Sequence, residues 1–258
     1  MAMPVASKNG HAGHAGRADV PHSPSGAQPP CTRLELVGVG YRYEGCQEAV
    51  LKDADAAFVG GKVYAIVGQS GAGKSTLLSL ISGLDICTEG DIRYNGASLR
   101  GLDRDEYRAK SVGVVFQGYN LLLGSTAAYN VALSMCISGC AAKGRKERKE
   151  AACALLEKVG IDREAAGRKV LRLSGGEQQR VGIARALSHS PDVVIADEPT
   201  GNLDEETEAA ILGILARLAH DEGKCVVIVT HSDEVAVAAD EVVCIRAGRL
   251  LRNRQETS

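Results

Sequence analysis

Residues 62–76 read KVYAIVGQSGAGKST, an apolar run followed by a glycine-rich turn that ends in Lys-Ser. The run at 62–68 has the continuous apolar character of a buried strand. Residues 74–84, KSTLLSLISGL, predict a helix that stops at Gly83. Residues 68–75 fit the pattern G-x-x-x-x-G-K-[ST] in full, between the strand and the helix that this pattern requires. The stretch therefore predicts a phosphate-binding loop.

Such a loop binds phosphate because its glycines let successive N–H groups point inward at a helix N-terminus. Lys74 would reach the β- and γ-phosphates, and Ser75 would ligate Mg²⁺. The predicted nucleotide-binding residues here are Gly68, Gln69, Ser70, Gly71, Ala72, Gly73, Lys74, Ser75 and Thr76. The loop alone is equally compatible with a GTPase or a small-molecule kinase, and its structural alternative is a glycine-rich turn that happens to end in Lys-Ser.

Strands and helices alternate along the rest of the chain. Further apolar runs that end in polar residues are found at 111–117, 192–198 and 225–231, with helical patterns at 146–161 and 206–223. This alternation predicts an α/β fold whose mostly parallel sheet is covered on both faces. Ligands of such sheets bind at the carboxyl ends of the strands. The residues expected at that edge are Gly68, Gln117, Asp197, Glu198 and His231.

These strand-end side chains suit the hydrolysis of a phosphate ester. Asp197 would hold Mg²⁺, and Glu198 would act as the general base for the attacking water. His231 would contact the γ-phosphate and the water, and Gln117 would bind both Mg²⁺ and the water. The predicted catalytic residues are Lys74, Gln117, Glu198 and His231, and the predicted metal ligands are Ser75, Gln117 and Asp197. The alternative is that the two acids cap the turn PTGNLD and that the histidine is only a strand-end residue.

A second glycine-containing motif, LSGGEQQRVGIARAL, occupies residues 173–187. Ser174 and Glu177 have the S-x-x-E form of a capping box, which is a purely structural explanation. It does not explain Gly175 and Gly176, each of which costs about 1 kcal/mol relative to Ala in a helix. Glycines at a helix N-terminus favour the close approach of an anion. Because the chain has one complete nucleotide loop, the motif predicts contact with ATP bound by another molecule.

LSGGEQQR resembles the signature motif of ATP-binding cassette (ABC) proteins. The order of phosphate loop, Gln117, signature, IADEPTGNLD and VIVTH is similar to that family over about residues 33–250. The resemblance implies a RecA-like P-loop NTPase core, an antiparallel β-subdomain and a small helical signature subdomain. It also implies a head-to-tail dimer, in which Ser174, Gly175 and Gly176 contact the partner's ATP. The D-loop would be 201–204, with Asp204 at the nucleotide.

The same resemblance implies that Tyr43 stacks on adenine, with nearby Tyr41 as the alternative. The amino-acid sequence at residues 112–131, 173–187 and 196–204 is similar to that of the macrolide-exporter and lipoprotein-release group. Two departures are the absence of a proline after the Leu run at 121–123 and Cys87 in place of a proline.

The expected function is that of an ATPase subunit that energises a separate membrane permease, exporting or extracting a peptide, drug or lipoprotein-like substrate. The alternative is a regulatory ABC ATPase of cell-division type that signals through a membrane partner without transport. A third class, the soluble ABC proteins of translation or DNA repair, is excluded because it needs tandem cassettes or a long coiled coil. The expected location is cytoplasmic, on the inner face of the membrane.

Composition sets the remaining expectations. A net charge of −2 gives no general attraction to nucleic acid, and eight scattered cysteines without a Cys-x-x-Cys predict reduced thiols.

We expect a disordered tail at 1–31, one ATPase domain at 32–250 with its helical subdomain at about 118–180, and a second tail at 251–258. Residues 111–142 contain no charged residue or histidine. Polar residues interrupt this stretch, so it predicts no membrane span; it would form either the docking surface for the permease or the interior of the helical subdomain.

Overall fold

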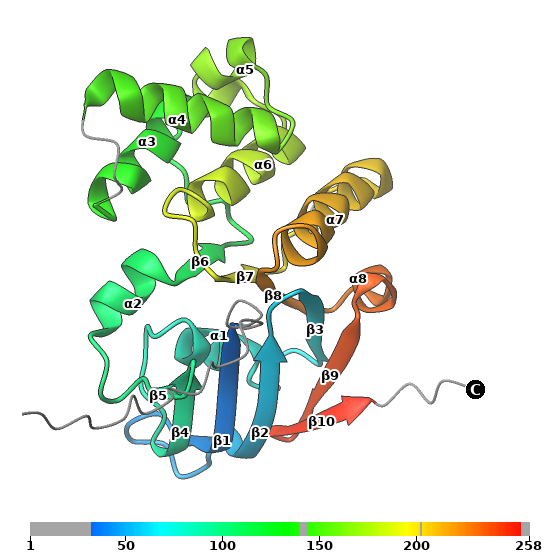
Figure 1. Ribbon diagram of the computed structural model, residues 1–258. Helices are drawn as coiled ribbons and strands as arrows, with labels where there is room; N and C mark the ends of the chain where they lie inside the picture. Colours follow the sequence, from blue (N-terminus) through cyan, green and yellow to red (C-terminus); the bar gives the residue numbers. More distant parts are fainter. Residues whose placement is uncertain (1–31, 140–143, 202, 254–258) are drawn as a thin grey trace, which may run out of the picture. The chain divides into compact units, whose positions relative to one another are not determined.

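A computed structural model of the chain describes residues 32–139, 144–201 and 203–253. The elements in chain order (Figure 1) are β1 (Arg33–Tyr41), β2 (Leu51–Val59), β3 (Lys62–Gly68), α1 (Lys74–Ile81), β4 (Glu89–Tyr94), β5 (Ala97–Ser98), α2 (Arg104–Lys110), β6 (Val112–Val115), α3 (Ala127–Ile137), α4 (Arg145–Lys158), α5 (Arg163–Gly167), the 3₁₀ turn η1 (Val170–Arg172), α6 (Gly175–Ala186), β7 (Val193–Asp197), α7 (Glu205–His220), β8 (Cys225–Thr230), α8 (Asp233–Ala238), β9 (Glu241–Arg246) and β10 (Arg249–Asn253).

The larger sheet has six strands in the order β10-β9-β3-β8-β7-β6. All neighbours are parallel except β10, which pairs antiparallel with β9. In the register, Val67 lies beside Thr230 and Asp197 lies beside Val229. Every residue of β8 is buried, as expected for a strand in the centre of a doubly covered sheet. The register therefore brings the ends of β3, β7 and β8 to the same edge, as predicted.

The smaller sheet is antiparallel and has the order β2-β1-β4-β5. One apolar cluster joins it to α1 and to one face of the larger sheet, and its largest members are fully buried Phe58, Tyr64, Leu77 and Ile66. Phe58 and Tyr64 contact edge to face, with ring centroids 5.0 Å apart. This sheet is the predicted antiparallel β-subdomain, and its packing fixes the position of the loop that follows β3.

Helices α3, α4, α5 and α6 form the helical subdomain, seen at the top of Figure 1. Their apolar faces meet around Val131, Leu156 and Ile183, which are all fully buried. A single antiparallel bridge between Thr126 and Lys169 joins the start of α3 to the segment that leads into α6. The α/β class, the two sheets and the helical subdomain thus agree with the prediction.

Two predicted boundaries differ from the observed elements. Helix α6 continues to Ala186, beyond the expected limit near 180, because Ile183 and Ala184 are still fully buried. Strand β10 continues to Asn253, because it pairs with β9 along its whole length. The predicted tail at 1–31 and residues 254–258 lie outside the described residues.

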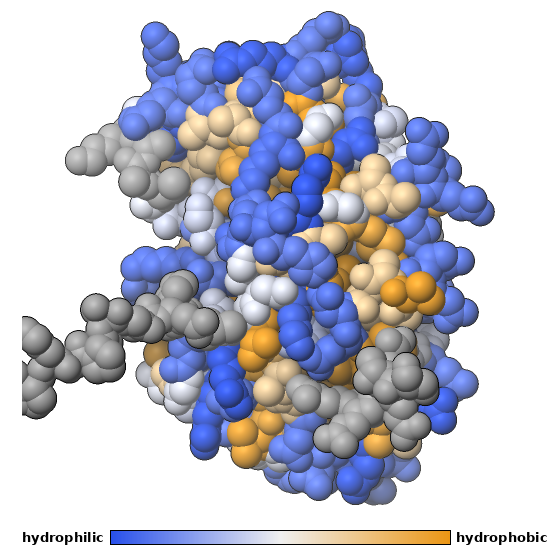
Figure 2. All heavy atoms as spheres, turned by 45° about the vertical axis from the view of Figure 1, so that its right-hand side comes forward, coloured by the Kyte–Doolittle hydropathy of each residue, from blue (hydrophilic) through white to orange (hydrophobic). Residues whose placement is uncertain are grey.

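Figure 2 shows a face of mostly hydrophilic side chains interrupted by hydrophobic patches.

Candidate functional site

The loop between β3 and α1 is shaped by two glycines. Gly73 has φ +106°, and a Cβ there would lie 3.2 Å from Val50 and Leu51. A Cβ on Gly68 would lie 2.8 Å from the carbonyl oxygen of Ile245 in β9. The left-handed backbone and the close packing therefore both require glycine. They hold the loop in one conformation between β2 and the large sheet.

Helix α1 begins at Lys74 with no side-chain cap and no acid in its first turn. Its first N–H groups are thus available to an anion, and the helix dipole favours one there. The Lys74 ammonium donates to the carbonyl oxygens of Gly68 at 2.7 Å and Gln69 at 3.3 Å. The loop and its lysine form a cationic cradle, which is the geometry that phosphate oxygens need.

Two tyrosines lie at one side of this cradle. Tyr43 is 47% exposed, and its hydroxyl is 2.9 Å from Oγ1 of Thr76 in α1. Tyr41 is buried and donates to Asp85, and this hydrogen bond, together with burial, raises the pKa of Tyr41 to about 12. The rings meet edge to face, with centroids 5.0 Å apart. The accessible ring beside the loop is that of Tyr43.

The two acids have different surroundings at the end of β7. Burial and the neighbouring charge of Glu198 raise the pKa of Asp197, while Lys74 opposes this shift. Glu198 has φ +45°, a strained conformation that typically costs about 1–3 kcal/mol and occurs at functional sites. The Glu198 side chain meets Thr230 and His231 at the end of β8.

There, the carboxylate of Glu198 has three partners. It accepts from the Thr230 hydroxyl at 3.2 Å and from the His231 backbone N–H at 3.3 Å. Its second oxygen is 2.8 Å from Nδ1 of His231, so a histidine that carries its proton on Nδ1 donates to it. The side chain of Glu198 is 13% exposed and that of His231 is 68% exposed. The acid is thus held in a fixed orientation, and the histidine remains open to a ligand.

Most predicted site residues line one open pocket of about 420 Å³. Its lining consists of Tyr43, Val50, Ser70, Gly71, Gly73, Lys74, Ser75, Thr76, Gln117, Asp197 and Glu198. Val50 was not predicted, because an aliphatic residue that only contacts a ligand leaves no pattern in the sequence. Gln117 approaches from beyond β6, with Nε2 next to Gly201. The pocket can hold a nucleotide phosphate chain with two carboxylates, an amide and the hydroxyls of Ser70, Ser75 and Thr76 around it.

The residues at the start of α6 do not belong to this pocket. Ser174 and Glu177 form the complete capping box, with bonds of 3.2 Å and 2.7 Å between each side chain and the other residue's N–H. A Cβ on Gly176 would lie 2.4 Å from Cγ2 of Thr207 in α7. Packing against α7 is therefore a second reason for a glycine at position 176, and its contact with the partner's ATP stays a prediction. Gly175 has a looser environment, with the nearest contact at 3.2 Å to the Tyr119 hydroxyl.

Asp204 also lies outside the pocket lining. It is the N-cap of α7 and accepts from the backbone N–H and the hydroxyl of Thr207, both at 2.9 Å. These bonds lower the pKa of Asp204. Asn202, part of the predicted D-loop, is outside the described residues. Within one chain, the structure thus separates Ser174, Gly175, Gly176 and Asp204 from the nucleotide pocket.

Across residues 32–139, 144–201 and 203–253, no helix is both long and apolar enough to cross a membrane. The described part of the charge-free stretch, residues 111–139, contains both buried and exposed side chains. Val112, Val131 and Met135 are buried, whereas Leu122 and Leu123 are each 49% exposed. Part of it is therefore interior and part is surface.

The family model described as ABC transporter matches residues 51–201 of this chain. Three individual proteins are also similar to it. The lipoprotein-releasing system ATP-binding protein LolD of Syntrophotalea carbinolica is 44% identical over 204 residues, covering 78% of this chain and 88% of LolD. The macrolide export ATP-binding/permease protein MacB of Mannheimia succiniciproducens is 40% identical over 210 residues, covering 80% of this chain and 32% of MacB. A solved dimeric post-hydrolysis state of the ATP-binding cassette MJ0796, bound to ADP and Pi, matches with a TM-score of 0.78 at 34% identity, covering 85% of this chain and 97% of that one.

Proposed function

This chain belongs to the ABC transporter family, and we propose that it is an ATPase that works as one half of a head-to-tail dimer and energises a membrane permease. The similarity to LolD and MacB agrees with the predicted resemblance to the lipoprotein-release and macrolide-exporter group. The observation that carries the proposal is the shared pocket of the phosphate loop, Gln117, Asp197 and Glu198. By this proposal the chain is cytoplasmic and is held at the membrane by the permease.

The residues of the pocket divide the chemistry among them. Lys74 and the N–H groups of α1 would bind the phosphates, and Tyr43 would stack on the adenine. Glu198 would take a proton from the attacking water, while His231 orients the carboxylate from its Nδ1 side. The exposed ring of His231 would then contact the γ-phosphate. All of these side chains line the pocket except that of His231, which contacts the pocket residue Glu198.

The same pocket fits Mg²⁺, which was predicted beside the nucleotide. Mg²⁺ prefers oxygen ligands and is usually held by one or two carboxylates together with substrate phosphates. Ser75, Gln117 and Asp197 supply a hydroxyl, an amide and a carboxylate on one lining. The raised pKa of Asp197 shows a carboxylate whose charge is poorly compensated, a condition that a cation would relieve. When bound, the ion would neutralise charge on the phosphates.

The direct test of the proposed function is ATP hydrolysis by the purified chain. We expect phosphate release that depends on Mg²⁺ and rises more steeply than linearly with protein concentration, because two subunits make each site. Hydrolysis that is proportional to protein concentration, with no dimer in ATP, would contradict the dimer proposal.

The adenine contact gives a separate prediction. The Tyr43→Ala substitution should weaken ATP binding by about 5- to 150-fold, because stacking of a base on an aromatic ring contributes about 1–3 kcal/mol. Tyr41→Phe is the matched control: it removes the hydrogen bond to Asp85 but leaves the buried ring. Titration calorimetry with ADP measures both. A Tyr41→Ala variant that loses affinity while Tyr43→Ala keeps it would make Tyr41 the stacking residue.

Docking to the permease is the second prediction from this proposal. Leu122 and Leu123 are each 49% exposed next to the bridge at Thr126, so charged substitutions there should spare folding and basal ATP hydrolysis. They should abolish permease binding, because a charge on an apolar contact loses its hydration without gaining a partner. Leu121→Glu is the comparison, since Leu121 packs against the core and its replacement should destabilise the chain.

Co-purification with a membrane partner, together with thermal unfolding of each variant, measures the result. If Leu122→Glu and Leu123→Glu unfold the chain as Leu121→Glu does, this segment is interior and is not a docking surface.

A further inference from the structure

The outward face of α3 is apolar along its whole length. Tyr129 and Cys136 are seven residues apart and therefore lie on the same face of the helix, with half-buried Leu133 between them. Tyr129 is 49% exposed, and Ile137 at the last position of α3 is 78% exposed. Apolar side chains are therefore exposed near both ends of α3, as well as at Leu122 and Leu123 before it.

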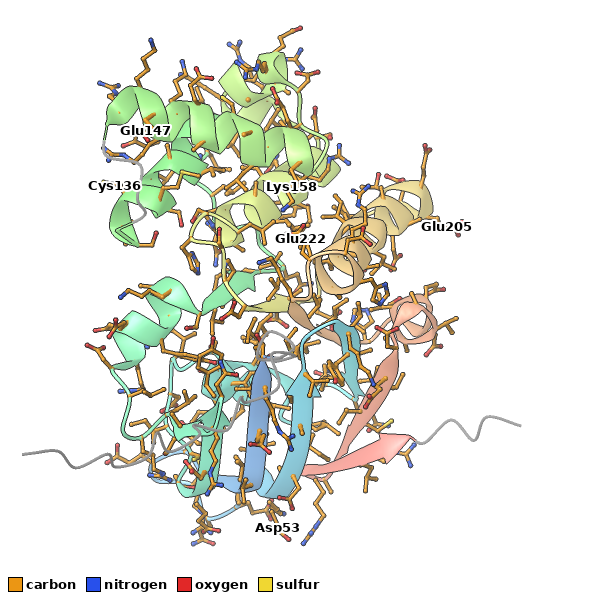
Figure 3. The ribbon with its side chains drawn as sticks, viewed as in Figure 1. Asp53, Cys136, Glu147, Lys158, Glu205 and Glu222 are labelled. Carbon is orange, nitrogen blue, oxygen red and sulfur yellow. The ribbon has the colours of Figure 1, made fainter. Side chains whose placement is uncertain are left out.

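At that end the apolar face meets a group of cations at the start of α4. Arg145, Lys146 and Lys149 are exposed, and in the described part of the chain their side chains form no ion pair or hydrogen bond. They occupy an arc of about 100° on the helix, at 100° per residue. Figure 3 labels Cys136 on α3 and Glu147 on α4 at this corner of the helical subdomain. We call Ile137, Arg145, Lys146 and Lys149 the α3–α4 corner.

Folding does not explain these cations. Arg145 and Lys149 lie on the same helical face as Ala152 and Leu156, which are fully buried, so the first turn of α4 extends beyond the helices that support it. Cations in the first turn also oppose the helix dipole. Residues 118–180 contain 11 Lys and Arg but only 6 Asp and Glu, although the whole chain carries −2. The three cations therefore cost stability at the start of α4, and their side chains have no partner in the described part of the fold. Such a cost indicates a partner outside the protein.

We propose that the α3–α4 corner contacts the anionic headgroups of the lipid bilayer next to the permease. Arg145, Lys146 and Lys149 would face the headgroup phosphates, and Ile137 would reach the boundary of the acyl chains. This inference rests on the proposed function, because docking of the permease at Leu122 and Leu123 would bring the helical subdomain next to the membrane. The spread of three cations beside an exposed aliphatic side chain matches a charged layer above an apolar one.

The first experiment is sedimentation of the full chain with vesicles. Vesicles of phosphatidylglycerol and phosphatidylcholine should bind the chain, and vesicles of phosphatidylcholine alone should not. Binding should decrease as NaCl rises from 0.1 to 1 M, which shortens the Debye length from about 10 Å to about 3 Å. Binding that is equal for both vesicles, or absent from both, overturns the proposal; the corner would then belong to a protein partner.

Variants test whether the corner itself makes the contact. Arg145→Glu with Lys149→Glu should weaken vesicle binding by at least about 30-fold, because each basic residue removed costs about 1 kcal/mol and the two new acids are repelled by the headgroups. Lys52→Glu with Arg246→Glu makes the same charge change at exposed positions elsewhere and should leave binding unchanged. Equal losses in both pairs would show a general charge effect and overturn the proposal.

A fluorescent reporter tests the apolar part of the contact. The chain has no tryptophan, so Ile137→Trp introduces a unique one at the corner. Its emission should shift to shorter wavelength when anionic vesicles are added. Val237→Trp, at a position of α8 that is 84% exposed, is the control and should not shift. An unshifted Ile137→Trp variant overturns insertion at this corner.

ATP hydrolysis separates this inference from the function on which it rests. The Arg145→Glu/Lys149→Glu variant should hydrolyse ATP at the wild-type rate, because neither residue lines the nucleotide pocket. Normal hydrolysis without vesicle binding by the wild-type chain overturns only the lipid contact. A wild-type chain that hydrolyses no ATP overturns the proposed function instead.

Discussion

The Glu198→Gln variant is expected to bind ATP as tightly as the wild type and to lose about 10²–10⁴-fold of its hydrolysis rate. An amide keeps the shape of the carboxylate but cannot take a proton from water. It can still accept from the Thr230 hydroxyl and the His231 N–H, so the orientation of the side chain is retained. Because bound ATP is then not consumed, the variant should accumulate as a dimer whenever ATP is present.

Single-turnover hydrolysis and gel filtration with and without ATP measure the two parts of this result. Glu222→Gln is a matched control: the same chemical change is made at a surface ion pair with Lys158, away from the nucleotide pocket. It should show wild-type turnover and no stable dimer. Full turnover by Glu198→Gln would remove Glu198 as the general base.

A larger qualitative effect is expected from mixing two inactive variants. If Ser174 contacts the γ-phosphate bound by the partner's Lys74, each site takes one of these residues from each chain. In a dimer of Lys74→Ala with Ser174→Arg, one site carries both defects and the other carries neither. Activity should therefore reappear on mixing, to about half of the wild-type rate per mixed dimer if the sites act independently.

The structure supports this design because Ser174 is absent from the lining of its own chain's pocket. A helix cap acting only within its chain would leave a defect in every site, and mixing would restore nothing. A dimer that needs two intact sites would also show no rescue. A heterodimer of wild type with Lys74→Ala is therefore measured in parallel. Activity in that heterodimer without rescue in the mixture would contradict contact in trans.

The sequence predicted best those parts of the fold that local patterns determine. Strand β3 has the bounds expected at 62–68, and β7 and β8 begin and end within one residue of the predicted runs. A continuous apolar run followed by a polar residue is sufficient to identify such strands. The same patterns placed the loop, Asp197 and Glu198, which the structure brings into one pocket.

Features that depend on distant contacts were not predictable in this way. The short helices α2 and α8 and the pairing of β9 with β3 have no strong local pattern. Two glycines illustrate the same limit. Gly73 was recognisable because the loop pattern requires it, whereas the close neighbour of Gly176 is Thr207, which lies 31 positions later and approaches it only after folding. A sequence pattern can require a glycine without revealing which neighbour needs the space.

The contact of Thr207 with Gly176 also has a consequence for how accurately two subunits must fit. The same threonine binds Asp204 through its N–H and its hydroxyl, so one residue connects the beginnings of α6 and α7. In the proposed dimer, Ser174 and Asp204 would both face the partner subunit. The distance between these two residues would be fixed by the close packing of α6 against α7. In such a dimer, a nucleotide that lacks the γ-phosphate would leave the Ser174 contact unmade.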